Sequence, residues 1–257
     1  MGNASLKKIA VLTSGGDAPG MNAAIRAVVR TANYHKIECV GVRGGYTGLI
    51  EGNFTKMGPR SVSNIINLGG TILRSARSKE FRTEEGRQKA FEQCQKNGID
   101  ALVCIGGDGT FTGAKIFAEE FGVKVIGVPG TIDNDIFGTD FTIGYDTALN
   151  TAMEAIDKIR DTATSHNRVF FIEVMGRDAG FIALNSGIAS GALDILIPEK
   201  KDSLEDLFET FEKAQERGKT SSIVIVAEGE RLASTYELAE QTKQRFPDYD
   251  IRVSILG

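Results

Sequence analysis

Residues 12–22 read LTSGGDAPGMN and lie between a strand-like run, KKIAV (7–11), and a helix-like run, AAIRAVVRTA (23–32). A plain turn needs one or two glycine or proline residues, whereas this stretch holds three glycines, a proline and an aspartate. Glycines let a ligand approach the backbone closely, and unpaired amides at the start of a helix attract anions. The stretch predicts a phosphate-binding loop; the alternative is that its glycines serve only tight packing of the helix.

The alternation of strand, loop and helix continues along the chain. Apolar runs rich in β-branched residues are separated by stretches of helical period, such as 147–163, where Leu149, Met153, Ile156 and Ile159 share one face. We expect strands at 8–13, 38–44, 101–107, 124–130, 168–176, 194–199, 221–229 and 251–257. Unbroken apolar runs are typical of parallel strands covered by helices on both faces. The pattern predicts an α/β fold with mainly parallel sheets in two Rossmann-like, three-layer lobes.

We place the boundary between the two lobes near residue 144. Residues 1–144 form the expected large lobe and 145–257 the smaller one, with the helical stretch 146–163 as the hinge. Helix signals agree with this organisation, because Thr83 is a predicted N-cap of a helix that stops at Gly98. Ser203 followed by Asp206 resembles a capping box.

The composition of the chain excludes several classes of protein. With 257 residues, 41% hydrophobic and 25% charged, it can bury a full core, and its net charge of -4 argues against a general nucleic-acid binder. The start MGNASLKK has no apolar signal region and no run is long enough for a membrane span, so we expect a cytoplasmic protein. Cys39, Cys94 and Cys104 fall at no metal-ligand or redox spacing and are expected to be buried thiols.

Two further loops follow apolar strands and carry carboxylates. The segment ALVCIGGDGTFTGAKIF (101–117) repeats the order strand, Gly-Gly-Asp, helix, and PGTIDND (129–135) follows the next strand. Because ligands of open α/β sheets lie beyond the carboxyl ends of strands, Asp108, Asp133 and Asp135 are predicted to face one ligand. Carboxylates beside phosphate imply magnesium or a base acting on a hydroxyl, and phosphoryl transfer needs both. A lone loop aspartate is more often an Asx turn or helix cap.

Six segments together resemble one family. LTSGGDAPGMNAAIR (12–26), SARS (75–78), GGDGT (106–110), PGTIDND (129–135), DTATSHNR (161–168) and EVMGR (173–177) resemble bacterial-type 6-phosphofructokinases in order and spacing. The resemblance extends from residue 7 to residue 257. It implies the phosphofructokinase fold and an enzyme of glycolysis that transfers the γ-phosphoryl group of MgATP to the 1-hydroxyl of fructose 6-phosphate, an alcohol acceptor, to give fructose 1,6-bisphosphate and ADP.

The resemblance also implies a nucleotide site. Its residues would be Gly16, Tyr46, Arg77, Ser78, Arg82, Gly107, Asp108, Gly109, Thr110 and Gly113. Asp17, Ala18 and Pro19 would shape the turn after Gly16. Asp108 is similar to the family aspartate that holds Mg2+ on the nucleotide phosphates, and Asp135 would lie near the same ion.

On the acceptor side, the resemblance implies a catalytic group and a sugar-phosphate site. Asp133 resembles the general base, while Thr131 and Arg177 would stabilise the transferring phosphoryl group. The sugar-phosphate residues would be Thr131, Asp133, Asp135, Arg168, Met175, Gly176, Arg177, Glu228 and Arg252. Arg168 and Arg252 match arginines that clasp the 6-phosphate of a neighbouring subunit. Each arginine could instead be an ordinary surface residue, and Met175 a core residue.

Two glycines favour ATP over pyrophosphate as the phosphoryl donor. In the family, an aspartate after GGD and a lysine before TID accompany the use of pyrophosphate, and this chain has Gly109 and Gly130 there. A side chain at either position would fill space that the α-phosphate and nucleoside of ATP must occupy. We expect the double variant Gly109→Asp, Gly130→Lys to lose the use of ATP.

The chain departs from the family pattern in two respects. It ends at RVSILG, where the family continues into HIQRGG, so we expect a truncated chain in which the large lobe lacks its return elements and exposes an edge. The basic residues Arg26, Arg30, Arg160, Arg217 and Lys219 match an effector site for ADP or phosphoenolpyruvate. Pro59 and Leu193 differ from the arginine and the glutamate usual there, and Arg26 and Arg30 could simply be a solvated helix face. The family is usually a homotetramer.

Three alternatives stay open on the sequence alone. They are a pyrophosphate-dependent phosphofructokinase, another small-molecule kinase with GGDGT that acts on NAD or a lipid, and an inactive nucleotide-binding subunit. PGTIDND and EVMGR count against the second, and Asp133 with Asp108 against the third.

Overall fold

The computed structural model describes residues 6–164, 168–219 and 221–257. Residues 165–167 of the DTATSHNR motif lie outside the described part. The contacts divide the chain into two units: residues up to Ile132 with Ile136–Gly144, and Asp133–Asp135 with Tyr145–Gly257. Each unit is built around its own sheet.

Among the described residues of the first unit, six strands form one sheet in the order β3-β2-β1-β4-β5-β6. Its elements are β1 (Lys8–Thr13), α1 (Met21–Tyr34), β2 (Glu38–Val42), α2 (Gly45–Glu51), β3 (Phe54–Met57), the 3-10 helix η1 (Glu80–Arg82), α3 (Glu84–Lys96), β4 (Ala101–Gly106), α4 (Asp108–Phe121), β5 (Lys124–Thr131) and β6 (Ile143–Gly144). Strand β3 is antiparallel to β2, and the other pairings are parallel.

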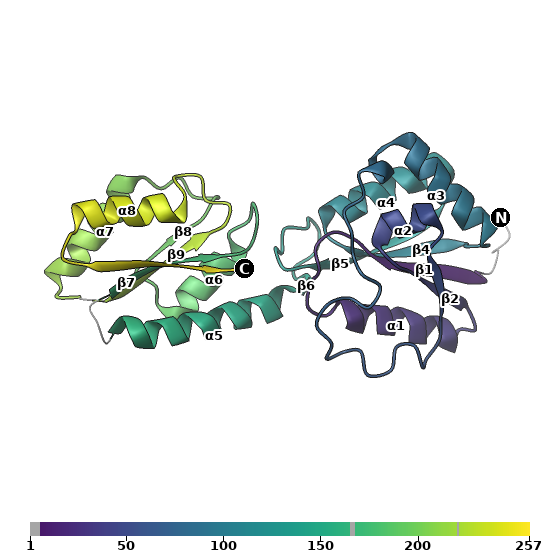
Figure 1. The fold of residues 1–257 in the computed structure, drawn as a ribbon, viewed down its shortest axis with the longest axis horizontal. Helices are drawn as coiled ribbons and strands as arrows, with labels where there is room; N and C mark the ends of the chain where they lie inside the picture. The colour runs from purple at the N-terminus through teal and green to yellow at the C-terminus, as the bar shows by residue number, and fades with distance from the viewer. Residues whose placement is uncertain (1–5, 165–167, 220) are drawn as a thin grey trace. The chain divides into compact units, whose positions relative to one another are not determined.

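Helices cover both faces of this sheet (Figure 1). Because successive strand residues point to opposite faces, Ala10 and Leu12 of β1 pack against α2, α3 and α4, whereas Val11 packs against α1. Strand β5 is covered less completely, and its Ile126 is 66% exposed. Two apolar layers therefore hold the central strands in place.

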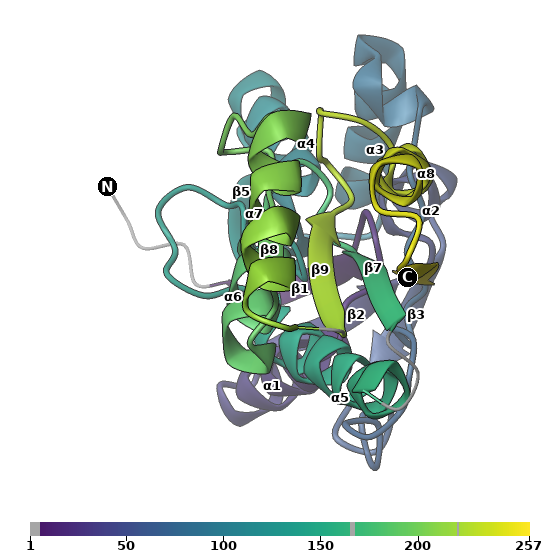
Figure 2. The ribbon, with the colours of Figure 1, turned by 90° about the vertical axis from the view of Figure 1, so that its left-hand side faces the viewer.

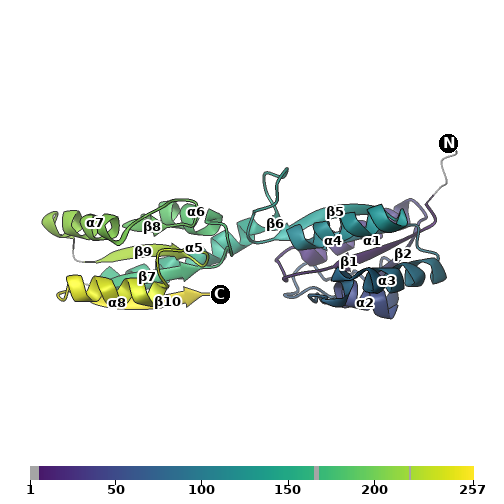
Figure 3. The same ribbon diagram turned by 90° about the horizontal axis from the view of Figure 1, so that it is seen from above.

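The second unit has a four-stranded parallel sheet within the described residues, in the order β10-β7-β9-β8. Its elements are α5 (Tyr145–Thr164), β7 (Arg168–Val174), α6 (Phe181–Ser190), β8 (Asp194–Leu196), α7 (Leu204–Glu216), β9 (Ser222–Ala227), α8 (Thr235–Arg245) and β10 (Asp250–Leu256). Figure 3 shows β10 and β8 on opposite sides of the central strands β7 and β9.

Helices α7 and α8 cover one face of the second sheet, and α5 and α6 cover the other (Figures 1 and 2). On the first of these faces, Val169 and Phe171 of β7 pack with Phe211 of α7 and Leu238 of α8. The helix starts are fixed by capping boxes, at Ser203 with Asp206 as expected, and also at Ser234 with Glu237.

The α/β class with mainly parallel sheets is confirmed, as are the eight expected strands. Thr83 accepts a hydrogen bond from the Gly86 amide at the start of α3, as predicted. Strands β3 and β6 and the helix η1 were not predicted. Across residues 6–164, 168–219 and 221–257, none of the helices combines the length and the hydropathy of a bilayer-spanning segment.

Candidate active site

The first sheet reverses its winding between β1 and β4. From β1 the chain moves outward to β2 and β3 on one side, and then continues through β4 and β5 on the other. Crevices for ligands form at such a reversal, beyond the carboxyl ends of the strands. Here β1 leads into the loop 14–20, and β4 leads through Gly107 into α4.

Hydrogen bonds join these two loops directly. The Ser14 amide donates to the carbonyl of Ile105 (3.0 Å), and Thr110 Oγ1 donates to the carbonyl of Ser14 (3.1 Å). A Cβ on Gly106 would lie 2.4 Å from the Ser14 carbonyl oxygen and 2.5 Å from Thr110 Oγ1. Residue 106 is therefore glycine because the loops approach each other too closely for a side chain.

The surface of the two loops is open at the positions predicted to meet phosphate. A Cβ added to Gly16 or to Gly109 would find no atom within 4 Å. Asp108 is exposed in the first turn of α4, and Gly107 lies next to Thr131, whose Cβ would be 3.7 Å from an added Cβ. Gly16, Gly107, Asp108, Gly109 and Thr131 are thus brought to one edge of the sheet, where helix α4 supplies unpaired amides.

The segment that carries Arg77 and Ser78 is docked onto the same edge. Asp17 accepts a hydrogen bond from the Thr71 amide (2.9 Å), and Asn22 Nδ2 donates to the carbonyls of Leu68 and Gly70. Arg77 is exposed on this segment. Asp17 therefore shapes the candidate site by holding the loop at Thr71, which is distant in sequence.

Tyr46, predicted to line the nucleotide site, lies in the core. The residue is 5% exposed, its hydroxyl donates to the Thr110 carbonyl (2.6 Å), and burial raises its pKa. Its ring stacks on Phe81 at 3.9 Å between centroids, and a Cβ on Gly113 would touch both rings at 3.3–3.4 Å. Tyr46 and Phe81 thus pack against α4 at Thr110 and Gly113, while Arg82 is exposed.

A hollow of about 390 Å³ lies beside α2 in this unit. Thr47 and Glu51 line one wall, and Arg43, Arg74 and Ala76 line another. Neither Gly16 nor Asp108 is part of it, so the open loop surface described above is a separate feature.

The two glycines that favour ATP differ in their surroundings. A Cβ on Gly109 would point into open space, whereas one on Gly130 would lie 3.1 Å from Ile105 and 3.4 Å from Met21. Gly130 is buried, so packing alone disfavours a lysine there. A substitution at Gly109, unlike one at Gly130, therefore tests the choice between ATP and pyrophosphate without disturbing the core.

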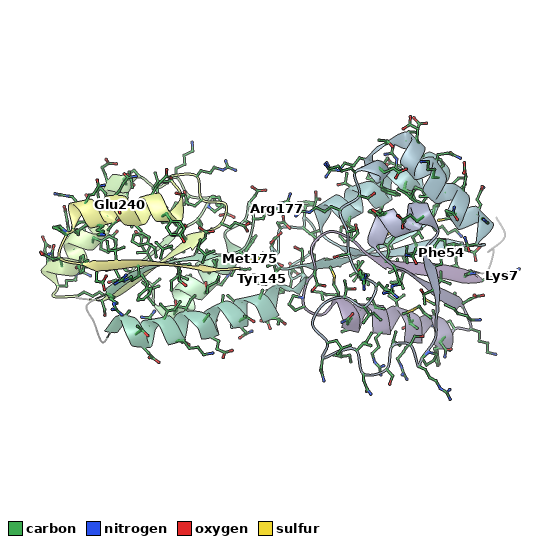
Figure 4. All side chains as sticks on the ribbon, in the orientation of Figure 1. Lys7, Phe54, Tyr145, Met175, Arg177 and Glu240 are labelled. Carbon is green, nitrogen blue, oxygen red and sulfur yellow. The ribbon has the colours of Figure 1, made fainter. Side chains whose placement is uncertain are left out.

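In the second unit, one group of predicted residues lies at the carboxyl end of β7 and β9. Met175 follows β7 and is 42% exposed, and Arg177 has a left-handed backbone (φ 56°). The Arg177 amide donates to Glu228 Oε2 (3.0 Å), and the Glu228 amide donates to the Val174 carbonyl. Figure 4 shows Met175 and Arg177 at the same end of this unit as Tyr145. Left-handed non-glycine residues concentrate at functional sites.

Arg168 and Arg252 lie at the opposite, amino end of this sheet. Arg168 Nε donates to Asp250 Oδ2 (2.8 Å), and Arg252 Nε lies 3.1 Å from Asp250 Oδ1. The hydrogen bond from Arg168 holds the pKa of Asp250 below its ordinary value. Because β7 runs from Arg168 to Val174, the length of this strand, roughly 20 Å, separates the pair from Met175 and Arg177. The structure brings together only part of the predicted sugar-phosphate set.

The predicted carboxylates belong to different units. Contacts group Asp133 and Asp135 with the second unit and Asp108 with the first. Within the described residues, no group of three or more histidine, cysteine, aspartate or glutamate side chains could hold a metal ion, so the carboxylates alone do not form a complete metal cage. Magnesium bound through phosphates needs only one or two carboxylates, and the exposed Asp108 fits that requirement.

The predicted effector residues are also divided. Arg26 and Arg30 lie on α1 of the first unit, where Arg26 donates to the carbonyl of Val62. In the second unit, Arg160 donates to the carbonyl of Ser190, and Arg217 is the C-cap that follows α7, two residues before Lys219. Leu193 packs beside the core of this unit.

Sequence reasoning missed three charged residues. Asp250 joins the two arginines, Glu199 accepts a hydrogen bond from the Gly180 amide ahead of α6 (2.8 Å), and Arg87 is 8% exposed beneath η1. Asp250 and Arg252 are two residues apart on β10 and so share a strand face, which only weakly indicates an ion pair. Glu199 and Arg87 gain their roles from partners distant in sequence.

Open glycine loops at the reversal of a doubly wound sheet, with an exposed aspartate at the helix start, are typical of α/β proteins that bind phosphate groups. The family model for phosphofructokinase matches residues 8–257. The chain belongs to the phosphofructokinase family.

Relatives with reported names agree. An ATP-dependent 6-phosphofructokinase 2 of Bacteroides thetaiotaomicron is 58% identical over 253 residues, covering 98% of this chain and 78% of the relative. An ATP-dependent 6-phosphofructokinase 1 of Thermus thermophilus is 58% identical over 252 residues, with the same coverage. The solved phosphofructokinase of Saccharomyces cerevisiae superposes with a TM-score of 0.92 at 39% identity. The superposition covers 98% of this chain and 38% of the yeast chain.

Proposed function

We propose that this chain transfers the γ-phosphoryl group of ATP to the 1-hydroxyl of fructose 6-phosphate. The observation that carries the proposal is the joined pair of loops at the β1–β4 reversal, with open space at Gly16 and Gly109 and with Asp108 exposed beside Gly109. The identity to named ATP-dependent enzymes supports the same reaction.

In the proposed reaction, Asp133 takes the proton of the 1-hydroxyl while the oxygen of that hydroxyl bonds to the γ-phosphorus of ATP. The bond from that phosphorus to the β–γ bridging oxygen breaks, and ADP leaves with the electron pair. Thr131 and Arg177 donate to the oxygens of the transferring group. Asp108 and Asp135 would hold magnesium, whose charge would neutralise that of the phosphates. The other residues predicted above for the nucleotide and the sugar phosphate bind and orient the two substrates.

We further propose a division of labour between the two units. The lobe expected from sequence at residues 1–144 binds the nucleotide, and the lobe at 145–257 binds the sugar phosphate. The position of Arg168 and Arg252 at the amino end of the second sheet, away from Met175 and Arg177, supports their acting on the sugar phosphate of a neighbouring subunit in a homotetramer. Binding of ADP or phosphoenolpyruvate at the basic effector residues is part of the same proposal.

Steady-state transfer to fructose 6-phosphate, with ATP and pyrophosphate compared at equal magnesium, tests the proposal. We expect fructose 1,6-bisphosphate with ATP and none with pyrophosphate. Product with pyrophosphate alone would contradict the donor. Absence of product with both, in a chain that is folded by circular dichroism, would contradict the proposed activity of this chain.

A further inference from the structure

The 3-10 helix η1 is held from behind by one buried guanidinium. Arg87 Nη1 donates to the carbonyl oxygens of Phe81 (3.1 Å) and Arg82 (2.8 Å). On its other side, Nε and Nη2 donate to the two carboxylate oxygens of Glu120, each at 2.6 Å. One side chain of α3 therefore ties η1 to the last turn of α4.

The chemistry of this contact is specific to arginine. The guanidinium presents several donors in a fixed plane, so it can bind a carboxylate with two parallel hydrogen bonds and still reach two carbonyls. The hydrogen bond from Arg87 holds the pKa of Glu120 below its ordinary value, so the carboxylate is ionised at neutral pH. The Arg87 side chain is 9% exposed, which limits competition from water.

The helix η1 carries one of the predicted nucleotide residues, Arg82, and a buried ring, Phe81, that packs beside α4. Arg82 is its last residue and is exposed, and Phe81 stacks on Tyr46 with 7° between the ring planes. Tyr46 in turn donates to the Thr110 carbonyl in the first turn of α4. The contacts therefore run from Glu120 at one end of α4, through Arg87 and η1, to the other end beside Asp108.

We propose that Arg87 and Glu120 are positioning residues for the nucleotide. By fixing the backbone of Phe81 and Arg82, they hold the exposed Arg82 in the arrangement that receives ATP. Through the buried Tyr46–Phe81 stack, they also hold the first turn of α4. This inference rests on the proposed function of the first unit as the nucleotide-binding unit. It assigns to the pair an effect on nucleotide binding that leaves the sugar phosphate unaffected.

The matched control is a second link between α3 and η1. Lys89 Nζ lies 2.8 Å from Glu80 Oε1, with the two side chains 59% and 49% exposed. Exposed pairs of this kind contribute little to stability. Lys89→Met therefore removes a charged contact between the same two elements without touching the carbonyls of Phe81 and Arg82.

The experiment measures the KM for ATP, the KM for fructose 6-phosphate, and the Kd of MgADP by calorimetry. We expect Arg87→Met to raise the KM for ATP and the Kd of MgADP about tenfold, as the loss of charge-assisted hydrogen bonds suggests, with the KM for fructose 6-phosphate within about twofold. Glu120→Gln keeps the acceptor oxygen but not the charge, and should give a smaller rise of about threefold. Lys89→Met should leave all three constants unchanged.

A double variant separates positioning from stability. Arg87→Met leaves the partly exposed Glu120 carboxylate without its partner, and Glu120→Leu removes that charge, so the double variant should recover part of the urea midpoint lost in Arg87→Met. The inference predicts that its Kd for MgADP stays raised. Recovery of nucleotide affinity together with stability would overturn it, as would an unchanged Kd in Arg87→Met. A parent chain that binds no MgADP would instead refute the proposed function, and this inference with it.

Discussion

The two units place their predicted site residues differently. In the first unit, the predicted nucleotide residues and the side chains that support them gather at the carboxyl edge of one sheet, joined by hydrogen bonds such as that from Thr110 to Ser14. In the second, Met175, Arg177 and Glu228 lie at the carboxyl edge, and Arg168 with Arg252 lies at the amino edge. The predicted ligand residues of the first unit therefore lie at a single edge, while those of the second are divided between two.

The largest effect is expected at Asp133, which the contacts group with the second unit. Asp133→Asn removes the proposed base, so kcat should fall about 10³-fold with little change in either KM. Asp157→Asn, an exposed residue of α5 in the same unit, is the control and should keep full activity. A kcat within tenfold of the parent would contradict the role of Asp133 as base.

Subunit mixing tests whether the divided set works between subunits. Arg252→Ala alone should raise the KM for fructose 6-phosphate by about one to two orders of magnitude, because a charge-assisted contact to phosphate is lost. The mixing assay uses fructose 6-phosphate far below the KM of Arg252→Ala, where each variant alone has little activity. If Asp133 and Arg252 act in the same site from different subunits, reassembled mixtures of Asp133→Asn and Arg252→Ala should restore measurable activity. Mixtures that stay as inactive as the two variants apart would show that each subunit supplies a whole site.

Two alanine substitutions in the first unit sharpen the account of its joined loops. At Gly106 a Cβ would collide with Ser14 and Thr110, so Gly106→Ala should lower the free energy of unfolding by about 3 kcal/mol. At Gly109 the space is open, so Gly109→Ala should leave stability within about 0.5 kcal/mol. Urea titrations check both values; equal stability of the two variants would contradict the close approach of the loops.

The donor can be tested at Gly109 alone. Gly109→Asp places a carboxylate where the nucleotide phosphates are proposed to lie, so we expect a KM for ATP raised at least about tenfold with an unchanged urea midpoint. This single variant replaces the double variant expected from sequence, because Gly130 is enclosed by Ile105 and Met21. Normal ATP kinetics in Gly109→Asp would contradict the proposal that the nucleotide phosphates lie beside Gly109.

The smallest expected effect is a pH dependence at the amino edge of the second sheet. The Arg168 hydrogen bond lowers the pKa of Asp250, so their contact stabilises the fold above the ordinary aspartate pKa and is lost as the pH falls through the lowered value. Arg168→Met removes this contribution, and its urea midpoint should fall less steeply than that of the parent below about pH 4. Parallel curves for the two proteins would show that the pair contributes nothing to acid stability.

The sequence predicted those parts of the fold whose signal is local. Parallel strands such as β1 and β4 are buried on both faces, so unbroken apolar runs identified them, and Thr83 and Ser203 are caps with a fixed local pattern. Strand β3 reads FTKM, with two exposed residues at a sheet edge, and β6 has only two residues, so neither produces a periodic signal.

The candidate site shows the same limit. The glycine-rich loops at Gly16 and Gly107 were recognisable because glycine itself reports close backbone approach. Arg87 and Asp250 were not, because each is defined by partners that the sequence does not place beside it: Arg87 by Glu120, and Asp250 by Arg168. The hydrogen bond from the Tyr46 hydroxyl to the Thr110 carbonyl was likewise not predictable, and contact of Tyr46 with the nucleotide stays a prediction.

The most direct test of the central claim is to observe where nucleotide binds on the first unit. In an amide nitrogen–proton NMR titration with MgADP, the account predicts the largest shifts at Gly16 and at Gly107, Asp108 and Gly109, with smaller shifts at Arg77 and Arg82. Shifts confined to other parts of the chain, or none at saturating MgADP, would contradict the assignment of the β1–β4 edge as the nucleotide site.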